Sequence, residues 1–387
     1  LPAWQRLKPV HPVATTPPHG VAFSAFRPLT DKTPARDTRP MTDLHDDKSP
    51  GRPLIDLDPD WLALAGEPVL EPDLPIVDAH HHLWELPGSH YPAEELLADL
   101  DAGHRIAATV FVECRAWYRP DGPPELRSLG ETEFIRDVGT EAAARGRHGI
   151  CAGIVGNVDL RLGDRARPVL EAHVAAADGR FRGIRNGAAW HKDVRGTTAA
   201  PPPGLMMDPA FRTGFAALAP LGLSFDVWAL HTQLDEVADL VRAFPDTAIV
   251  LDHVGGPIGV GPFAGRRDEV FAEWRARILE LAQFPNLTVK LGGLCMRIVG
   301  FAFHERPAPP DSATLAAAWK PYVETCIAAF GPERCMFESN FPVDKGMCTY
   351  RSLWNAFKRL TAGCSENEKK SLFSGTAGRV YRLQTEN

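Results

Sequence analysis

The feature that most constrains the fold is an eightfold alternation between short β-branched segments and longer amphipathic segments. From Leu74 onward, apolar runs predict strands over residues 76–82, 107–114, 149–158, 181–188, 224–228, 248–254, 287–292 and 335–339. The stretches that follow them have helical spacing over residues 93–102, 131–145, 164–177, 209–219, 233–244, 268–283, 314–330 and 350–360. Eight strands, each followed by a helix, predict an α/β fold of the closed (β/α)8 TIM-barrel type.

An open, doubly wound sheet is the rival fold for such an alternation. That fold usually carries a glycine-rich phosphate loop after its first strand, and this chain has none there. Four connections that follow predicted strands are long, and in a barrel such connections lie on the catalytic face. We therefore expect a TIM barrel with long βα loops at residues 115–130, 190–208, 255–267 and 294–312.

The 387 residues allow either two domains or one large barrel with insertions. We expect an N-terminal extension at residues 1–73 and a barrel at residues 74–387. Residues 1–40 contain eight prolines, six Lys or Arg and two acids, without sustained periodicity. Such a stretch is typical of a disordered or targeting segment, or of an over-extended start before Met41.

Composition limits the partners. The net charge is −7, and the basic residues 1–40 leave the remainder still more acidic, which argues against nucleic acid as a partner. Seven cysteines without CxxC spacing favour reduced thiols in a cytoplasm. No apolar run approaches the roughly 18 residues of a membrane span. We expect a cytoplasmic protein that acts on a small molecule, with a homo-oligomer left open.

The first predicted strand carries the most distinctive motif, Asp78-Ala79-His80-His81-His82. Successive side chains of a strand point to opposite faces, so we expect Asp78, His80 and His82 to share the interior face. His81 is expected on the other face. Two neutral imidazoles at the spacing of His80 and His82 can hold one divalent metal ion. A histidine-rich loop is the alternative, but the preceding Leu-Pro-Ile-Val favours a strand.

Further polar side chains stand at the ends of the other predicted strands. Charged groups on apolar strands are costly to bury unless they are paired or functional. The candidates are Glu113, Arg185, Trp228, His231, His253, Lys290, Glu338 and Asn340. Asp252, next to His253, is expected to point away from the lumen.

Several motifs together resemble a known family. They are Asp-Ala-His-His-His, Phe-Arg-Gly-Ile-Arg, Leu-Asp-His-Val-Gly-Gly-Pro and, near the last strand, Ser-x-x-Pro. They resemble the amidohydrolase-related (amidohydrolase 2) metal-dependent hydrolases, in the branch of sugar-acid lactonases, pyrone dicarboxylate lactonase and aminocarboxymuconate-type decarboxylases. The resemblance spans roughly residues 74–383. It implies that His80 and His82 bind metal or polarise the substrate, and His231 and His253 match later histidines of such sites.

One position departs from that family. Members usually end the last strand with Gly-Ser-Asp-Trp-Pro, whereas Asn340 replaces the aspartate here. An amide can donate a hydrogen bond or coordinate weakly, but it cannot take a proton from water at pH 7. Glu338, expected on the same face one layer deeper, either supplies the lost carboxylate or pairs with Lys290. The catalytic candidates are therefore His253 as the base, with Glu338 and Asn340.

The resemblance implies a lactonase-like hydrolase. A divalent ion, zinc or alternatively manganese, held by His80, His82 and His231 would assist opening of a small lactone or related cyclic ester bearing carboxylate or hydroxyl groups. A metal-free mechanism stays open.

The substrate-binding candidates are Arg185, Trp228, Glu113 and Lys290. Arg185 suits a carboxylate, and a structural ion pair is its alternative. The rival functions are a metal-dependent non-oxidative decarboxylase of an aromatic or muconate-type acid, and a non-catalytic barrel that binds a small acid.

Overall fold

The computed structural model describes residues 56–86, 89–195 and 201–383. The predictions for residues 1–40 fall outside these ranges. Within them, eight parallel strands form one sheet in the order β1-β4-β5-β6-β7-β8-β9-β10, which is the order of the chain. These strands are β1 (Ile76–His81), β4 (Ile106–Val112), β5 (Gly153–Gly156), β6 (Phe181–Gly187), β7 (Ser224–Trp228), β8 (Ile249–Leu251), β9 (Leu287–Leu291) and β10 (Cys335–Phe337).

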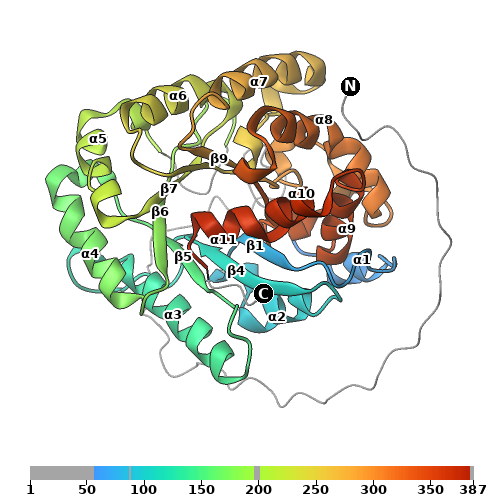
Figure 1. Ribbon diagram of the computed structural model, residues 1–387, viewed down its shortest axis with the longest axis horizontal. Coiled ribbons are helices and arrows are strands. Elements are labelled where there is room, and N and C mark those ends of the chain that lie inside the picture. Colours follow the sequence, from blue (N-terminus) through green and yellow to red (C-terminus); the bar gives the residue numbers. More distant parts are fainter. Residues whose placement is uncertain (1–55, 87–88, 196–200, 384–387) are drawn as a thin grey trace.

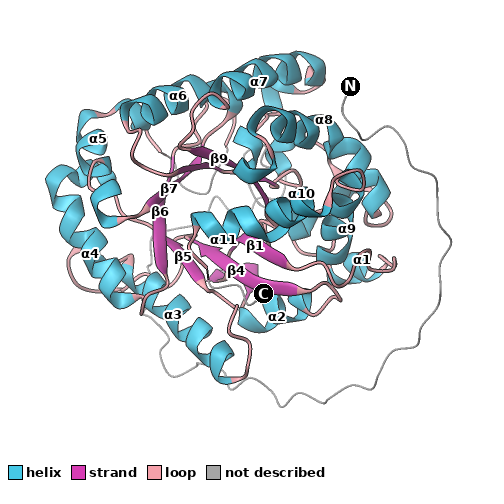
Figure 2. Cartoon of the chain, in the orientation of Figure 1, coloured by secondary structure: helices cyan, strands magenta, loops and turns pink. Residues whose placement is uncertain are grey.

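The two edge strands meet, so the sheet closes on itself. The backbone N–H of His82 donates to the carbonyl of Phe341 at 2.7 Å, and the N–H of Asn340 donates to the carbonyl of His80 at 2.9 Å. Figure 1 shows the strands as a ring with helices around it, and Figure 2 shows the same alternation by element type. The predicted (β/α)8 barrel is confirmed, and the open sheet is excluded because its edges are joined.

A helix follows each barrel strand, as predicted. These helices are α2 (Ala93–Leu100), α3 (Leu129–Ala144), α4 (Ala166–Ala176), α5 (Pro209–Phe215), α6 (Leu234–Ala243), α7 (Arg267–Leu281), α8 (Ser312–Phe330) and α9 (Tyr350–Leu360). The alternation did not predict a small hairpin of β2 (Trp84–Leu86) and β3 (Ser89–Tyr91), nor the short helices α1 (Pro59–Ala63), α10 (Glu366–Lys370) and α11 (Thr376–Val380). No helix in the described ranges is long and apolar enough to cross a bilayer.

The barrel interior has an apolar layer and a polar layer. Small and β-branched side chains from four strands pack together inside with Met336 of β10, and they include Val77, Ala108, Val155 and Val250. Tyr381, directly after α11, joins this apolar layer, and Figure 1 shows α11 lying across the strands. Because the interior is filled here, a ligand can approach only from the C-terminal ends of the strands, where the polar residues lie.

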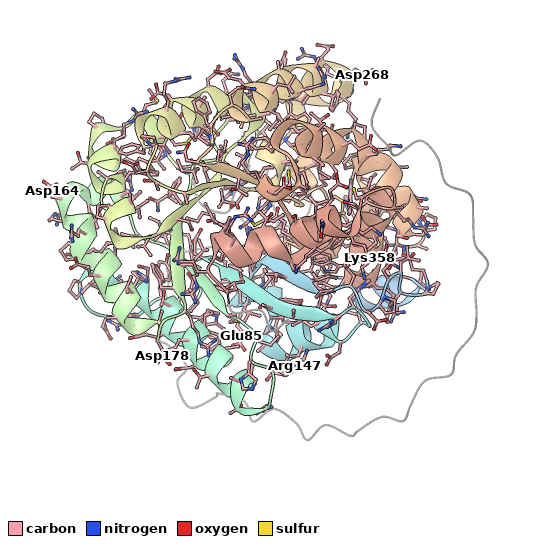
Figure 3. The ribbon with its side chains drawn as sticks, viewed as in Figure 1. Glu85, Arg147, Asp164, Asp178, Asp268 and Lys358 are labelled. Atoms are coloured by element: carbon pink, nitrogen blue, oxygen red, sulfur yellow. The ribbon has the colours of Figure 1, made fainter. Side chains whose placement is uncertain are left out.

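The charged outer surface contrasts with this interior. Figure 3 shows Asp164, Asp178 and Asp268 on the outer side of the helical ring, and all three are at least partly exposed.

Lys358, in contrast, is buried in α9 and only 1% exposed. Its ammonium donates to the carbonyls of Leu70 and Glu71, each at 2.8 Å. These two hydrogen bonds hold the segment before β1 against helix α9 of the barrel.

We expect truncation to separate the N-terminal extension into two parts. A chain that starts at Met41 should keep its melting temperature, because residues 1–40 lack the apolar periodicity needed to bury surface. A chain that starts at Leu74 should lose about 3 kcal/mol or more, because Lys358 and Asn355 lose their backbone partners at residues 68–71. Denaturant unfolding of both chains would measure this, and equal stability would contradict the anchoring.

Candidate active site

Nine polar side chains meet at the C-terminal end of the barrel. Each is buried, although most are charged or titratable. Contacts between them join β1, β4, β6, β7, β8, β9 and β10, so the barrel brings together residues far apart in the sequence. The residues are His80, His82, Glu113, Arg185, Asp226, Asp252, His253, Lys290 and Glu338.

The two histidines of the first strand face each other. Their Nε2 atoms lie 3.2 Å apart. His82 Nδ1 donates to the carbonyl of Val112 at 2.7 Å, so its Nε2 carries a lone pair directed at His80. His80 presents a lone pair as well when its Nδ1 proton points to Glu338 Oε2, 2.9 Å away. In that tautomer Arg185 Nη1, 3.3 Å away, donates to His80 Nε2. In the other tautomer His80 Nδ1 accepts from the Lys290 ammonium at 3.1 Å, and its Nε2–H donates to His82.

Burial keeps both rings neutral, as metal ligands must be. It lowers the pKa of His80 to about 4, helped by the nearby Lys290 ammonium. Burial is also the main cause that lowers the pKa of His82 well below its ordinary value, and His80 and Arg185 lower it further. Neutral imidazoles offer nitrogen lone pairs to a divalent ion without competition from protons.

The expected pattern of interior and exterior faces fails at Asp78. The pairing of β1 with β4 shifts register between Asp78 and His81, so the strand does not alternate strictly there. Ala79 packs in the apolar layer and His80 also reaches the centre. Asp78 instead accepts hydrogen bonds from the Tyr350 hydroxyl and the Ser339 backbone N–H, both at 2.9 Å. The prediction that Asp78 shares a face with His80 is wrong because of this irregularity.

Asp252 and His253 both reach the centre. Asp252 lies two residues after the interior Val250 and is therefore on the same face, so the prediction that it points away is wrong. His253 would alternate outward, but its backbone φ of 54° turns the chain at the end of β8. His80, Asp252 and His253 each offer one ligand atom, and these atoms lie within 4.8 Å of one another. This nitrogen and oxygen set fits a divalent cation.

His253 is held by Glu338. Its Nδ1 lies 2.7 Å from Glu338 Oε1, so Nδ1 donates and Nε2 retains the lone pair. Burial raises the pKa of the Glu338 carboxyl, but His253 and His80 outweigh it and bring that pKa to about 2. The ring packs edge-on against Trp228, with centroids 4.9 Å apart. A Cβ on Gly293 would lie 2.6 Å from the His253 ring, so only glycine fits there.

Lys290 is paired with acids other than Glu338. Its ammonium lies 2.7 Å from Asp226 and 3.0 Å from Asp252, and it is fully buried. The Tyr381 hydroxyl also donates to Asp226, at 2.6 Å. Burial lowers the pKa of Lys290, but the neighbouring acids outweigh it, so the pKa is raised overall. The alternative that Glu338 pairs with Lys290 is therefore wrong, because both histidines stand closer to Glu338.

Arg185 is occupied by protein groups. Its Nε donates to Glu113 Oε1 at 2.9 Å and its Nη2 donates to the Glu113 carbonyl. Nη1 lies 3.3 Å from His80 Nε2 and 3.6 Å from Asp252. The second carboxylate oxygen of Glu113 is buried without a hydrogen-bond partner in the described structure. This geometry matches the structural ion pair that the sequence left open.

Comparison with known proteins fixes the family. The sequence model of the amidohydrolase family matches residues 77–383. The chain belongs to the amidohydrolase family. A protein named y4mH from Sinorhizobium fredii is 34% identical over 333 residues, which cover 80% of this chain and 99% of that protein. An L-fucono-1,5-lactonase from Burkholderia multivorans is 29% identical over 326 residues, 79% of this chain and 96% of that enzyme.

A solved structure agrees with this assignment. An amidohydrolase from Burkholderia multivorans, crystallised with bound zinc, is 26% identical and superposes with a TM-score of 0.62. The match covers 80% of this chain and 99% of that protein. The prediction of an amidohydrolase-family hydrolase is confirmed.

Two predicted site residues of this amidohydrolase lie apart from the cluster. His231 Nδ1 accepts from the backbone N–H of Ile258 at 3.2 Å, and its ring packs edge-on against Phe263. It does not belong to the group of potential metal ligands found in the described ranges. The Asn340 amide donates to Asp344 at 2.8 Å rather than to either histidine of β1.

Sequence reasoning about this amidohydrolase misses three acids. Asp252 is predicted on the outer face, although its two-residue spacing from the interior Val250 indicates the inner face. Asp226 has no predicted role, although its two-residue spacing from Ser224 and from Trp228 places all three on the same face of the strand. Asp344 gives no signal, because it lies in the irregular turn η12 (Asp344–Gly346) after the last strand.

Proposed function

We propose that this amidohydrolase opens a small lactone by adding water to the ring carbonyl. The observation that carries the proposal is the His253–Glu338 pair beside the facing rings of His80 and His82. An ionised carboxylate that fixes Nδ1–H leaves Nε2 free to take a proton from water. The lactonase name of a relative that aligns over most of its length supports the same reaction.

The proposed reaction uses the site as follows. His253 Nε2 removes a proton from water as the water oxygen attacks the carbonyl carbon. Glu338 stays ionised and stabilises the resulting imidazolium, which then protonates the departing ring oxygen. Two members of the group of potential ligands, His80 and Asp252, together with His82, whose Nε2 faces His80, are the residues that would hold a divalent ion, zinc in our proposal, which when bound polarises the carbonyl. The product is an open-chain hydroxy acid.

The charges of the site favour an uncharged substrate. Arg185 and Lys290 both form ion pairs within the protein. Arg185 lies 2.9 Å from Glu113, and Lys290 lies 2.7 Å from Asp226. One buried carboxylate oxygen of Glu113 and one of Asp226 have no hydrogen-bond partner among the described residues. A site with surplus acceptors, in which Arg185 and Lys290 are already paired, suits hydroxyl donors better than carboxylates. We therefore propose a polyhydroxylated lactone, and the same argument disfavours decarboxylation of an aromatic acid.

We expect a substrate panel to show this preference. Purified enzyme should open neutral aldonic lactones with a kcat/KM at least about 100-fold above that for a pyrone dicarboxylate, because burying an unpaired carboxylate costs several kcal/mol. A pH-indicator assay measures ring opening, and carbon dioxide release from carboxylated phenols is measured in parallel. Carbon dioxide release without ring opening would establish the decarboxylase, and binding without turnover would establish the non-catalytic barrel.

We expect close to one equivalent of divalent metal in protein purified without chelator. His80→Ala and Asp252→Asn should each lower the bound metal substantially, because each removes one atom of the nitrogen and oxygen cluster. His231→Ala should retain the metal, as should the control His148→Ala outside the cluster. Elemental analysis measures the content directly. Loss of metal in His231→Ala would restore the sequence-based ligand set, and full activity of metal-free enzyme would instead favour polarisation by the histidines.

We expect His253→Ala to lower kcat by at least about 100-fold while the fold survives, since the general base is lost. Glu338→Gln should also lower kcat by about 100-fold or more, because an amide no longer fixes the His253 tautomer. Lys290 keeps Asp226 and Asp252 in that variant, so a large stability loss is not expected.

Steady-state kinetics and melting curves separate the two effects, with Glu324→Gln on the surface of α8 as the matched control. Near-normal kcat in His253→Ala would show that another group takes the proton.

A further inference from the structure

Lys290 carries a buried ammonium that touches two of the potential metal ligands. Its Nζ lies 3.1 Å from His80 Nδ1 and 3.0 Å from Asp252 Oδ1, and it donates to Asp226 Oδ2 at 2.7 Å. His80 and Asp252 belong to the group of potential ligands, whereas Asp226 is outside that group. The ammonium and a divalent ion therefore compete for the same two side chains.

The imidazole of His80 cannot serve the ammonium and an ion together. A neutral ring has one lone pair, because its other nitrogen carries the proton. An ion at Nδ1 takes the lone pair that accepts from Lys290. An ion at Nε2 requires the proton on Nδ1, which then donates to Glu338 Oε2, 2.9 Å away. In both cases Lys290 loses its hydrogen bond to His80.

Asp252 imposes the same choice through charge. Its Oδ1 lies 3.0 Å from the Lys290 ammonium, so an ion on that carboxylate brings two positive charges close together inside the barrel. Like charges repel strongly where water is excluded. The ammonium is therefore expected to move away from Asp252 when the ion binds.

The charge balance of the site matches one divalent ion. Its nine buried polar side chains include four carboxylates and two cations, with the histidines neutral. The excess of two negative charges equals the charge of one divalent ion. The ion therefore neutralises the site while Lys290 stays charged, provided that the ammonium keeps an acid as its partner after it leaves Asp252.

Asp226 supplies that partner. Its Oδ2 accepts from Lys290 at 2.7 Å and from the Tyr381 hydroxyl at 2.6 Å. Its Oδ1 is buried and has no hydrogen-bond partner among the described residues. An ammonium has three rotatable donors, so one that leaves His80 and Asp252 can direct a second N–H to Asp226 Oδ1. The lysine changes partners while it remains paired with an acid.

We infer that Lys290 is an internal competitor of the divalent ion, and that Asp226 sets the balance between the two cations. This inference rests on the ion of the proposed function and not on the opening of a lactone. With the ammonium on His80 and Asp252, the ligand side chains are held in place before the ion arrives. The ion must displace the ammonium, so its apparent affinity is lowered by the fraction of molecules in which the ligands are free.

The double variant Lys290→Met/Asp226→Asn separates competition from net charge. It removes one cation and one anion, so the excess of two negative charges is unchanged. We expect its zinc affinity to rise at least about tenfold, because the ligands no longer have to release an ammonium. Competition with a chromophoric chelator measures the dissociation constant, and a melting curve checks the fold. A folded double variant that binds zinc no more tightly than the unchanged protein overturns the inference.

The single variant Asp226→Asn tests the balance without removal of the lysine. An uncharged amide attracts the ammonium less than a carboxylate does, so Lys290 should stay on His80 and Asp252. We expect zinc affinity to fall about tenfold or more. Burial raises the pKa of Asp226 to about 6, so the comparison is made at about pH 8, where its carboxyl is ionised. An unchanged or higher affinity contradicts the inference, and this variant decides it if the double variant fails to fold.

A second triad in the protein gives a matched control. Lys345 and the Tyr91 hydroxyl both donate to Asp99 Oδ2, at 2.7 Å and 2.6 Å, which repeats the two hydrogen bonds that Asp226 Oδ2 accepts. None of these three residues belongs to the group of potential ligands found in the described ranges. Lys345→Met/Asp99→Asn should therefore leave zinc affinity within about twofold.

A rise in the control as large as that in the double variant would overturn the inference, because loss of any lysine–acid pair would then have the same effect. All of these affinities are measured without substrate. They decide the role of Lys290 whether or not the protein opens a lactone, and a negative lactone assay would refute the proposed function alone.

Discussion

Pairing of buried charges around Lys290 is the constraint on which the rest of the site depends. The ammonium is fully buried and needs Asp226 and Asp252 as counterions. Asp252 in turn lies 3.6 Å from both His80 and Arg185, and Arg185 is held by Glu113. Since no member can lose its partner without leaving an unpaired charge in the barrel, the network holds each side chain in one place.

The barrel supplies the rigid frame for this network. Its apolar layer and Tyr381 fill one end, so the charged residues gather at the other end, where the long loops begin. Local irregularities then aim the side chains. The register shift after Asp78 and the left-handed backbone of His253 bring three ring systems to one point. Strain of this kind persists only where the surroundings enforce it, which is typical of functional sites.

The arrangement divides the chemical tasks among neighbouring groups. Glu338 serves His253 and His80 together, through oxygens 2.7 Å and 2.9 Å from the two rings. One carboxylate thereby links the proposed base to His80, a potential metal ligand. Arg185 and Lys290, which resemble substrate anchors in the sequence, instead neutralise the acids around them. In our proposal, the surplus of acceptors favours hydroxyl groups of the substrate, although two cationic side chains lie in the site.

The alternation of apolar strands and amphipathic helices by itself determined the barrel, because the spacing of apolar residues in each element indicates both its type and its buried face. The His-x-His motif and the polar strand ends also named most residues of the site, since buried charges on strands are costly. Only the tertiary structure decided the partners. Strand parity misplaced Asp78, and no local signal joins Glu338 to His253 across 85 residues or Asp344 to Cys295. Such pairings depend on register, bulges and loop turns, which are set by contacts between segments distant in the chain.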